Sequence, residues 1–539
     1  MSNSTSKHSS SASIANRKKL LGYTDKLTVR PGEKIDFKVS SETGKAYTAQ
    51  LVQLINGDIY SDAANYKEIE IESRINGSYE GRTQPIHSGS CVIIDDAEPS
   101  IALDEFTLVM AIMPTLPEGG RQHLISRWEE LNNSGWSLQI NDQGQLSFVA
   151  ADSGGRVTKV ALEQSLSAKS WYRVALRVSW RTKTVQINCT SLPISANQMD
   201  QQNTSVTVGS LCELPQVSCP LIIAAAFGGL DSSARPIPLD CFNGRLEAPA
   251  IYRGILSDTE LAVVSIGERP KALAKHLIAD WDFSEGIGGI TIIDGSPNRL
   301  NGRTHNMPLR AVKGSYWDGS TLEWVQAPHQ YAAIHFHSDD LYDCGWLSDI
   351  TYIVPDTLRS GIYALRLRLS DDNLTMNYCE QTDEEYLPFF VAAPKHSPQS
   401  KVAFILPTYT YMAYGNNHLG EPDADFGDSP MMGPGTKAYY TDMIPVHYEL
   451  GLSAYDHHLD GSPAHFSPWL RPLLNMRPKT ILWTFCADLL FTDWMTVKEI
   501  DYDIITDDLL QQEGVGLLKQ YSVVMSGNHP EYPTTEQLD

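Results

Sequence analysis

Alternation between apolar and polar residues marks two groups of segments that are typical of half-buried β-strands. The first group lies near the N-terminus and the second far along the chain: residues 26–30, 34–40 and 47–54, then residues 350–355 and 362–369. A period of two places every second side chain on the same face of a sheet. We therefore predict one immunoglobulin-like β-sandwich made of residues 21–90 and 335–395, interrupted by an insertion. Residues 1–20 are rich in serine and asparagine, and we expect a disordered tail there.

The insertion, residues 91–334, has strand patterns that are longer and more evenly spaced. The predicted strands are residues 106–113, 136–140, 146–150, 171–180 and 184–188. Turns rich in glycine, asparagine and aspartate separate them. Many strands at regular spacing predict a two-sheet sandwich. The strand at 171–180, the Trp-Asp-Phe-Ser sequence at 281–284 and the turn at 294–298 resemble laminin-G-like or concanavalin-like modules. Such modules often bind sugars, so a carbohydrate-binding protein without catalysis is the alternative function.

From residue 401 onwards, short apolar strands alternate with helical segments. The predicted strands are residues 401–406, 479–485, 501–505 and 521–526. Thr506 is placed to cap a helix over residues 507–512, and Gly514 is placed to end it. This alternation predicts an α/β domain with a mostly parallel sheet over residues 396–539.

Three predicted loops beside these strands carry unusual polar chemistry. Residues 407–417 contain three tyrosines, residues 453–462 contain a Tyr-Asp-His-His sequence, and residues 527–531 are Gly-Asn-His-Pro-Glu. Open α/β sheets place their ligands at the carboxyl ends of strands, where the last segment would present His529 and Glu531. We expect the strands before the first and third segments to be neighbours, so that both segments face one crevice.

Composition and net charge argue against some classes of binding partner. The chain of 539 residues has 65 acidic and 42 basic side chains, which gives a formal net charge of −23. This charge argues against nucleic acid and anionic membranes as partners. No segment approaches the roughly 20 apolar residues of a membrane span, and the first residues lack the apolar core of a secretory signal. We therefore expect a cytoplasmic protein whose 8 dispersed cysteines are reduced and mostly buried.

Two other catalytic chemistries have weaker support in the sequence. Four histidines in one acidic region suggest a zinc hydrolase: His447, His457, His458 and His465. Their spacing does not give the i, i+4 pair that zinc enzymes commonly place on a helix. A serine nucleophile lacks its Gly-x-Ser-x-Gly sequence, and Cys486, expected at a strand end, has no histidine partner that the sequence can place.

Several short motifs together resemble one protein family. They are Pro-Thr-x-Thr-Tyr-x-Ala-Tyr at 407–414, Tyr-Asp-x-His at 455–458, Leu-Asn-Met-Arg-Pro at 474–478, Tyr-Asp-Ile-Ile-Thr with a later Glu-Gly at 502–514, and Gly-x-His-Pro-Glu-Tyr at 527–532. The family is the large (beta) subunit of N,N-dimethylformamidase and its homologues, and the resemblance spans essentially the whole chain. It implies an iron-dependent amidohydrolase that converts a small amide, such as dimethylformamide, to amine and formate. The α/β part would resemble the glutamine amidotransferases.

The resemblance also implies a site in which two tyrosinates and one glutamate hold a mononuclear Fe³⁺ ion. By motif, Glu531 is the carboxylate ligand, Tyr455 is one tyrosinate, and Tyr414 is the other, with Tyr411 as the alternative to Tyr414. His529 would contact the substrate or the attacking water, so that His529 and Glu531 are the expected catalytic residues. Anionic oxygen ligands suit a hard ferric ion, and three protein ligands leave positions open for amide hydrolysis without a protein nucleophile.

The resemblance extends to partners and chain length. The family's large subunit works with a small helical subunit, so we expect a hetero-oligomer. Family members continue past the position that corresponds to Asp539, where this chain ends in the first turn of a predicted helix. We therefore expect an incomplete α/β domain, without any catalytic residue that the missing part supplies. The resemblance leaves open which amide is the substrate and whether the chain is active alone.

Overall fold

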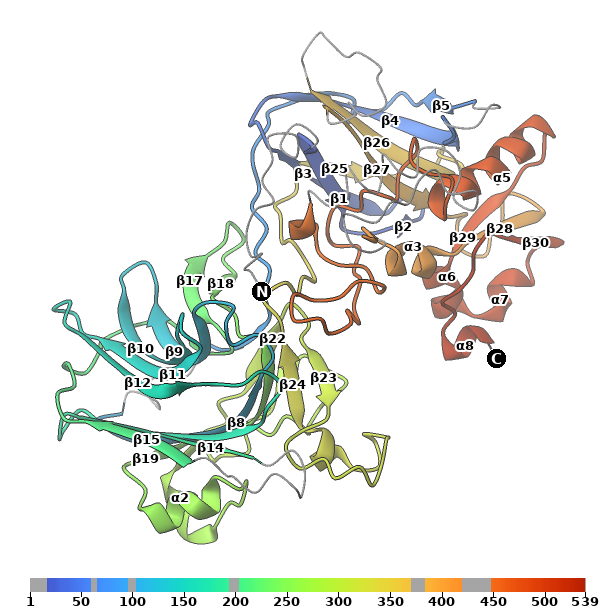
Figure 1. The fold of residues 1–539 in the computed structure, drawn as a ribbon. Helices are drawn as coiled ribbons and strands as arrows, with labels where there is room; N and C mark the ends of the chain where they lie inside the picture. Colours follow the sequence, from blue (N-terminus) through green and yellow to red (C-terminus); the bar gives the residue numbers. More distant parts are fainter. Residues whose placement is uncertain are drawn as a thin grey trace, which may run out of the picture. The chain divides into compact units, whose positions relative to one another are not determined.

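The computed structural model describes residues 17–59, 65–95, 103–192, 203–369, 383–418 and 447–538. The chain forms two compact units. Unit 1 comprises Met1–Ile86, Tyr342–His457 and Pro463–Asp539, and unit 2 comprises His87–Leu341 and His458–Ser462. Figure 1 shows the strands and helices of each unit.

Unit 1 contains a β-sandwich built from two distant parts of the chain. One sheet has the order β1 (Leu20–Thr24), β3 (Lys34–Ser41), β25 (Ile350–Ile353). The other has the order β2 (Thr28–Val29), β27 (Glu384–Val391), β26 (Gly361–Leu369), β4 (Tyr47–Asn56), β5 (Lys67–Glu70), with β6 (Gly77–Tyr79) also paired to β4. β26 runs antiparallel to β4, from Tyr363 opposite Gln53 to Leu369 opposite Tyr47. Strands from before and after unit 2 therefore share one core, which includes Phe37, Leu51, Leu365 and Phe389.

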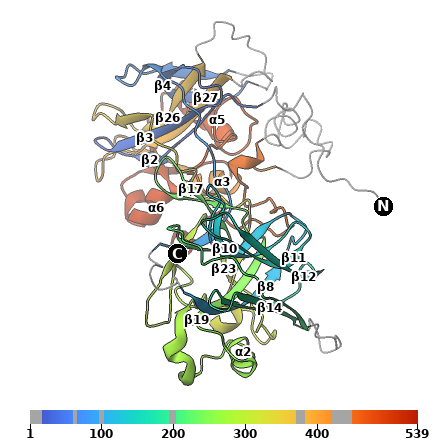
Figure 2. The same ribbon diagram turned by 90° about the vertical axis from the view of Figure 1, so that its left-hand side faces the viewer.

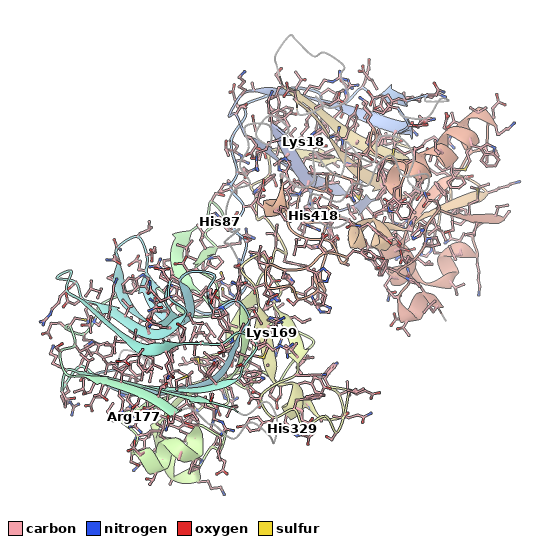
Figure 3. The ribbon with its side chains drawn as sticks, in the orientation of Figure 1. Lys18, His87, Lys169, Arg177, His329 and His418 are labelled. Atoms are coloured by element: carbon pink, nitrogen blue, oxygen red, sulfur yellow. The ribbon has the colours of Figure 1, made fainter. Side chains whose placement is uncertain are left out.

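The sandwich begins earlier than the sequence predicts. β1 starts at Leu20, inside the segment that we expected to be a disordered tail, and it pairs antiparallel with β3. Lys18 is buried as well, and its Nζ lies 3.1 Å from Oε2 of Glu385 on β27 (Figure 3). The difference arises because Leu20 and Leu21 pack in the interior and extend a sheet edge. The part of the tail before residue 17 lies outside the described residues.

A small parallel sheet forms near the C-terminus of unit 1. Its order is β29 (Asp503–Thr506), β28 (Val402–Leu406), β30 (Val523–Ser526). The helices around it are α3 (Thr408–Ala413), α5 (Phe485–Val497), α6 (Asp507–Glu513), α7 (Val515–Leu518) and α8 (Thr535–Leu538) (Figure 1). The strands that end at Leu406 and Ser526 are direct neighbours, which confirms that prediction. The division of unit 1 into a sandwich and a separate α/β domain stays a prediction.

Residues 479–485, predicted to be a strand of this sheet, instead form irregular turns that lead into α5. Lys479 and Thr484 have φ angles of 62° and 46°, in the left-handed region that a regular strand does not contain. The backbone N–H of Lys479 donates to the carbonyl of Gly57 at 2.9 Å rather than to a sheet neighbour. The apolar pattern of this segment therefore reflects burial within turns, as for Ile481, and not strand pairing.

The last strand of the sheet is more exposed than its apolar sequence predicts. Val523 is 51% exposed and Val524 is 43% exposed. β30 lies at the edge of the sheet, next to β28, so its faces are covered less completely than those of an inner parallel strand.

The helix start and end signals predicted near the C-terminus are only partly confirmed. α6 forms and ends before Gly514, whose φ is 66°. Thr506 does not cap it through its side chain, because its Oγ1 lies 2.9 Å from Oγ1 of Thr28. Residues 407–417, predicted to be a loop, contain α3, which begins after Pro407 without a side-chain cap and therefore lacks the usual start signal. None of the described helices is long and apolar enough to cross a membrane.

The cysteines of the described residues are buried and reduced, as composition predicts. Cys486 lies within α5 and not at a strand end. Burial raises the pKa of its thiol to about 11, and Sγ lies 3.6 Å from the carbonyl oxygen of Thr480. These surroundings do not support a thiolate nucleophile at this position.

Unit 2 is a sandwich of two large antiparallel sheets, which Figures 1 and 2 show as separate layers. One has the order β12 (Val157–Ser165), β11 (Gln145–Ala151), β10 (Ser134–Ile140), β9 (Gln122–Glu129), β16 (Leu221–Ile223), β7 (Cys91–Ile94), β22 (Gly302–His305), β21 (Thr291–Ile292). The other has the order β15 (Asn203–Val208), β14 (Thr184–Ser191), β13 (Tyr172–Ser179), β8 (Glu105–Pro114), β19 (Gly244–Arg253), β24 (Ala333–Phe336), β23 (Leu309–Val312). Phe106, Phe148, Leu176 and Phe242 are among the residues of the core that the two sheets share.

The motif residues that suggested a laminin-G-like module are structural in unit 2. Trp281 is fully buried, and its Nε1 donates to the carbonyl of Leu300 at 2.7 Å. The predicted turn is held by Asp294, whose carboxylate accepts backbone N–H groups of Ser296 and Leu300 at 2.8 and 2.7 Å. The two-sheet architecture is as expected, while the closer kinship with laminin-G-like modules stays a prediction.

Candidate functional site

The turn that follows β30 is fixed by contacts with α5 and α3. Gly527 is buried, and a Cβ atom there would come within 2.6 Å of Oδ2 of Asp488, so the turn has no space for a side chain. Oδ1 of Asp488 accepts the backbone N–H of Asn528 at 2.7 Å. Oγ1 of Thr410 accepts the backbone N–H of Glu531 at 3.0 Å. These bonds set the direction in which the Glu531 side chain leaves the turn.

Four of the predicted site residues meet at the Glu531 carboxylate, and we call them the tyrosine-glutamate cluster: Tyr414, Tyr455, His529 and Glu531. The Tyr414 hydroxyl donates to Oε2 and the Tyr455 hydroxyl to Oε1 of Glu531, both at 2.9 Å. Nε2 of His529 lies 2.9 Å from Oε2 of the same carboxylate. The two tyrosine rings are stacked, with centroids 4.3 Å apart and an interplanar angle of 21°.

The loop that carries Tyr455 is tied to the end of α3, next to Tyr414. The backbone N–H of Ala454 donates to the carbonyl of Ala413 at 2.9 Å. On the other side of Tyr455, Oδ2 of Asp456 lies 3.0 Å from Nδ1 of His418, which Figure 3 labels. These contacts explain how two tyrosines far apart in sequence are stacked on each other.

The geometry distinguishes between the two alternatives at the first tyrosine position. Tyr411 is 1% exposed, and its hydroxyl donates to Oδ2 of Asp488 in the interior. Tyr414 presents its hydroxyl to Glu531 instead. The structure therefore favours Tyr414 over Tyr411 as the partner of Tyr455 in a metal site.

The charges of the cluster suit a bound cation. Partial burial raises the pKa of both tyrosines, and for Tyr455 the bonds to its neighbours raise it further. Burial also opposes ionisation of Glu531, but the hydrogen bonds from Tyr455, Tyr414 and His529 outweigh it and hold the pKa of this carboxyl below its usual value. A carboxylate thus faces two phenol protons that an entering cation would displace.

The donor set fits a hard metal ion that solvent and substrate can reach. Two phenol oxygens and one carboxylate are oxygen donors, which favour ferric iron over the softer zinc and copper. Tyr455 is 40% exposed, and the side chains of His529 and Glu531 are 36% and 38% exposed. The cluster therefore combines the ligand chemistry predicted from the sequence with access from solvent.

Two curated proteins are similar to this chain along nearly its whole length. It is 34% identical over 542 residues to the N,N-dimethylformamidase beta subunit of Paracoccus aminophilus, covering 97% of this chain and 69% of the relative. It is 32% identical over 539 residues to the N,N-dimethylformamidase beta subunit of Alcaligenes sp, covering 96% and 68%. The chain belongs to the N,N-dimethylformamidase beta subunit family. This confirms the resemblance on which the sequence analysis relied.

The site lies in the part of the chain that a model of this family recognises. The model, described as N,N-dimethylformamidase beta subunit-like, C-terminal, matches residues 309–539. Tyr414, Tyr455, His529 and Glu531 all fall within this match.

Among solved structures, the CBM40 module of the Ruminococcus gnavus IT-sialidase, bound to sialyllactose, is similar to part of this chain. The two are 16% identical in sequence, the match covers 34% of this chain and 96% of that chain, and the TM-score is 0.25.

Two residues of this family member, Tyr532 and Trp483, contact the cluster, and Asp488 supports it from behind, although the sequence did not single out any of the three. The Tyr532 hydroxyl donates to the Tyr455 hydroxyl. The Trp483 ring lies 5.8 Å from Tyr414 and 4.9 Å from His529, measured between centroids. Asp488 holds the turn, as described above. Tyr532 is part of the Gly-x-His-Pro-Glu-Tyr motif and could have been found there, whereas Trp483 was hidden by the wrong strand prediction for residues 479–485.

The four histidines considered for a zinc hydrolase do not come together. Nδ1 of His447 lies 3.1 Å from Oε1 of Glu449, and His457 and His465 are exposed. His458 belongs to a different group of side chains in unit 2. Of these four histidines, His458 is the one that falls in a group of potential metal ligands among the described residues, so the weakly supported zinc-hydrolase alternative gains no four-histidine site.

A second group of ligand-type side chains is buried in unit 2, and we call it the histidine-aspartate cluster: His335, His337, Asp340, His458 and Asp460. It could hold a metal ion, because His335, His337 and Asp460, and likewise His337, Asp340 and His458, have ligand atoms within 4.8 Å of one another. Burial lowers the pKa of His335 to about 4, which favours the neutral imidazole. The signal in the sequence was His-Phe-His at 335–337, since residues i and i+2 of a strand point to one side.

A groove of about 860 Å³ on unit 2 is lined by residues of β9 to β12, where a sugar could bind. Trp128 is the aromatic residue among its described lining residues, and it is only 3% exposed. Small-molecule sites usually offer accessible hydrophobic or aromatic surface with a few polar groups. The groove therefore gives little support to the carbohydrate-binding alternative.

Proposed function

We propose that this chain is the iron-binding, catalytic subunit of an amidohydrolase for small amides such as dimethylformamide. The observation that carries this proposal is the convergence of Tyr414 and Tyr455 on the two oxygens of Glu531 at 2.9 Å each. Family membership supports the reaction class, because the relatives are N,N-dimethylformamidase beta subunits. Amine and formate would be the products.

In this proposal Tyr414, Tyr455 and Glu531 hold one Fe³⁺ ion. The phenols give up their protons on binding, since a nearby cation lowers the pKa of its ligands. The bound ion supplies Lewis acidity, which polarises an amide carbonyl and makes water more acidic. The stacking of the two tyrosine rings keeps their oxygens on the same side of the cluster.

His529 is the proposed proton carrier. Its Nε2 lies 2.9 Å from Oε2 of Glu531, so the imidazole is oriented beside the position where a reacting amide would bind. Because the hydrogen bond to Glu531 occupies Nε2, the imidazole accepts a proton from the attacking water at Nδ1 and returns it to the leaving nitrogen. Trp483 packs against the imidazole at 4.9 Å and limits the approach of solvent from that side.

The proposal includes a second polypeptide. The relatives are named beta subunits, which supports a heteromeric enzyme. In this proposal the partner is a small helical subunit. A cytoplasmic location remains part of this proposal. Co-purification of the chain with the product of a neighbouring reading frame, measured by mass spectrometry of the native complex, would test the partner.

Metal analysis together with a visible spectrum tests the iron site. The purified full chain should contain about one iron atom and absorb visible light through tyrosinate-to-iron charge transfer, which zinc cannot produce with its filled d shell. Glu531→Gln should lose both iron and colour. The control Glu536→Gln, on α8 and exposed, should keep both.

Two outcomes would contradict this assignment. If the wild-type chain stays colourless and iron-free after loading with ferric iron, the proposed iron site is wrong. Iron and colour unchanged in Glu531→Gln would remove Glu531 from the ligand set. His529→Ala should keep iron and its spectrum but lose turnover of dimethylformamide, so equal turnover would remove His529 from the mechanism.

A further inference from the structure

The histidine-aspartate cluster of unit 2 has the geometry of a preformed metal site that is separate from the tyrosine-glutamate cluster. Nε2 of His335 lies 3.2 Å from Oδ2 of Asp460, and Nε2 of His337 lies 3.8 Å from the same oxygen. Ligand atoms bound tetrahedrally at about 2.0–2.2 Å from zinc are roughly 3.4 Å apart. Both nitrogen–oxygen distances, and the 4.8 Å limit within which the ligand atoms of the three residues lie, fit ligands of one ion.

Ring orientation decides between the two overlapping sets of ligands. The rings of His337 and His458 are stacked with an interplanar angle of 2° and centroids 3.7 Å apart. An imidazole nitrogen binds a metal along its lone pair, in the ring plane, so two parallel stacked rings cannot both point at one ion. The rings of His335 and His337 are inclined by 45°, with centroids 4.1 Å apart, so their planes can meet at one point. The geometry favours His335, His337 and Asp460.

The ring nitrogen of His337 that faces away from this point has the partner that metal-binding histidines usually have. Nδ1 of His337 lies 3.3 Å from Oδ2 of Asp340, which also accepts a hydrogen bond from the Ser90 hydroxyl at 2.6 Å. A carboxylate at Nδ1 holds the proton there and leaves the lone pair on Nε2. In this tautomer Nε2 no longer donates to Oγ of Ser462, its neighbour at 2.9 Å.

The Asp460 carboxylate is arranged to offer one oxygen. Oδ1 accepts the backbone N–H and the hydroxyl of Ser462 at 2.8 and 2.5 Å. This leaves Oδ2 directed at the two histidines. The side chain of Asp460 is 1% exposed, and those of His335 and His337 are 5% and 2% exposed. A metal held here would be enclosed by protein, with no access for a substrate.

The buried charges around this point also favour a cation. Asp340, Asp460 and Asp339 supply three carboxylates, and Arg245, opposite His335 on β19, is a cationic group near Asp460. His458 pairs with Asp339 at 2.8 Å. Buried negative charge is costly, and a divalent ion would offset part of it.

We propose that His335, His337 and Asp460 bind one divalent transition-metal ion of the zinc type, and that Asp340 is a positioning residue for His337. Two imidazoles and one carboxylate suit zinc and its first-row neighbours, whereas calcium and magnesium prefer oxygen ligands alone. The ion is structural: it fastens the 458–462 segment to the end of β24 within unit 2. This proposal does not depend on the iron site.

Zinc binding to the full chain after removal of metal with a chelator tests the site. Equilibrium dialysis with metal analysis should show zinc bound to the wild type, and zinc should raise the melting temperature in a way that magnesium does not. Asp460→Asn and His335→Gln should weaken zinc binding by at least about 100-fold, and Asp340→Asn by about 10- to 100-fold. His458→Gln should change it by no more than a few-fold.

The outcomes separate this site from ordinary ion pairs between histidine and aspartate. A wild-type chain that binds no zinc and melts at the same temperature with and without it would overturn the proposal. Zinc lost in His458→Gln but kept in His335→Gln would overturn the ligand assignment. If a variant fails to fold, the comparison of zinc with magnesium on the wild type still decides whether a site exists.

Discussion

The two clusters differ in where their side chains stand and in what can reach them. The tyrosine-glutamate cluster takes its residues from turns and helix ends, and Tyr455 at its edge is 40% exposed. The histidine-aspartate cluster takes two residues from the end of one strand, and its proposed ligands are enclosed. Loop-borne, open groups are typical of reaction sites, whereas enclosed groups on a rigid sheet are typical of structural ones.

The comparison also shows two ways of holding a side chain in place. In the open cluster the backbone is fixed by contacts behind it, as Asp488 fixes the turn at Gly527. In the enclosed cluster the side chains are fixed by their own partners, as Asp340 fixes His337. Substitutions of residues that support the tyrosine-glutamate cluster, such as Asp488 and Gly527, should therefore change iron content and activity more than they change the structure of unit 2.

The largest effect is expected from Gly527→Ala. A Cβ atom there would lie 2.6 Å from both Oδ2 of Asp488 and Cδ of Pro407, so the turn must move. Overpacking of this kind costs about 1–3 kcal/mol of stability, and displacement of Glu531 should lower iron content and dimethylformamide turnover to near background. Metal analysis and a turnover assay on the same preparation would measure this.

Gly516→Ala is the matched control for this change. A Cβ atom at Gly516, on α7, meets nothing within 4 Å, and alanine is the better helix former by about 1 kcal/mol. This variant should keep its iron and melt at the same or a slightly higher temperature. If Gly527→Ala kept full activity and iron, the turn would not be what positions Glu531.

A medium effect, dependent on pH, is expected at Asp488. Burial raises the pKa of this carboxyl from 3.8 to about 6, more than the hydrogen bond from Tyr411 lowers it. As the pH rises from 4 to 6, the Asp488 carboxyl ionises in the unfolded chain but stays largely protonated in the folded chain. The free energy of unfolding should therefore fall by about 2–3 kcal/mol over this range. Denaturant unfolding followed at several pH values would show this decline.

Two substitutions distinguish the charge of Asp488 from its hydrogen bonds. Asp488→Asn cannot ionise but can still accept from Asn528, so it should remove the decline between pH 4 and 6 and keep iron. Asp488→Ala leaves the Tyr411 hydroxyl and the Asn528 N–H unpaired, at a cost of about 1–3 kcal/mol each, and should lose iron. An unchanged pH dependence in Asp488→Asn would assign the decline to other groups.

Much of the fold could be predicted because two-residue alternation reports directly on a sheet with one buried face. This held for β3, β4 and β26 and for the long strands of unit 2. It failed at residues 479–485, where burial in turns produced the same apolar pattern as a strand and the positive φ angles of Lys479 and Thr484 left no sequence signal. Alternation reports burial, and only pairing partners decide whether the buried segment is a strand.

The two clusters also differed in how far the sequence alone could reveal them. Tyr414, Tyr455, His529 and Glu531 could be named from the sequence because they sit in three distinct motifs, although only the structure showed that Tyr414, and not Tyr411, contacts Glu531. Three of the histidine-aspartate side chains lie within residues 335–340, but their partners His458 and Asp460 are more than a hundred residues away. The sequence alone does not show that these segments pack together, so it did not reveal this cluster.

The smallest effect is expected from Tyr532→Phe, which removes a hydroxyl beside the proposed ligands and nothing from the core. Tyr532 is 37% exposed, and its hydroxyl donates to the hydroxyl of Tyr455. Loss of an outer hydrogen bond should weaken iron binding by about 10-fold and shift the visible band, because the oxygen of Tyr455 would then carry more negative charge. Tyr521→Phe is the control, since that hydroxyl faces Asp503 at 3.2 Å and not the cluster. Stability should change by no more than about 0.5 kcal/mol in either variant. A visible band that moves equally in both, or in neither, would mean that Tyr455 does not bind the metal through its oxygen.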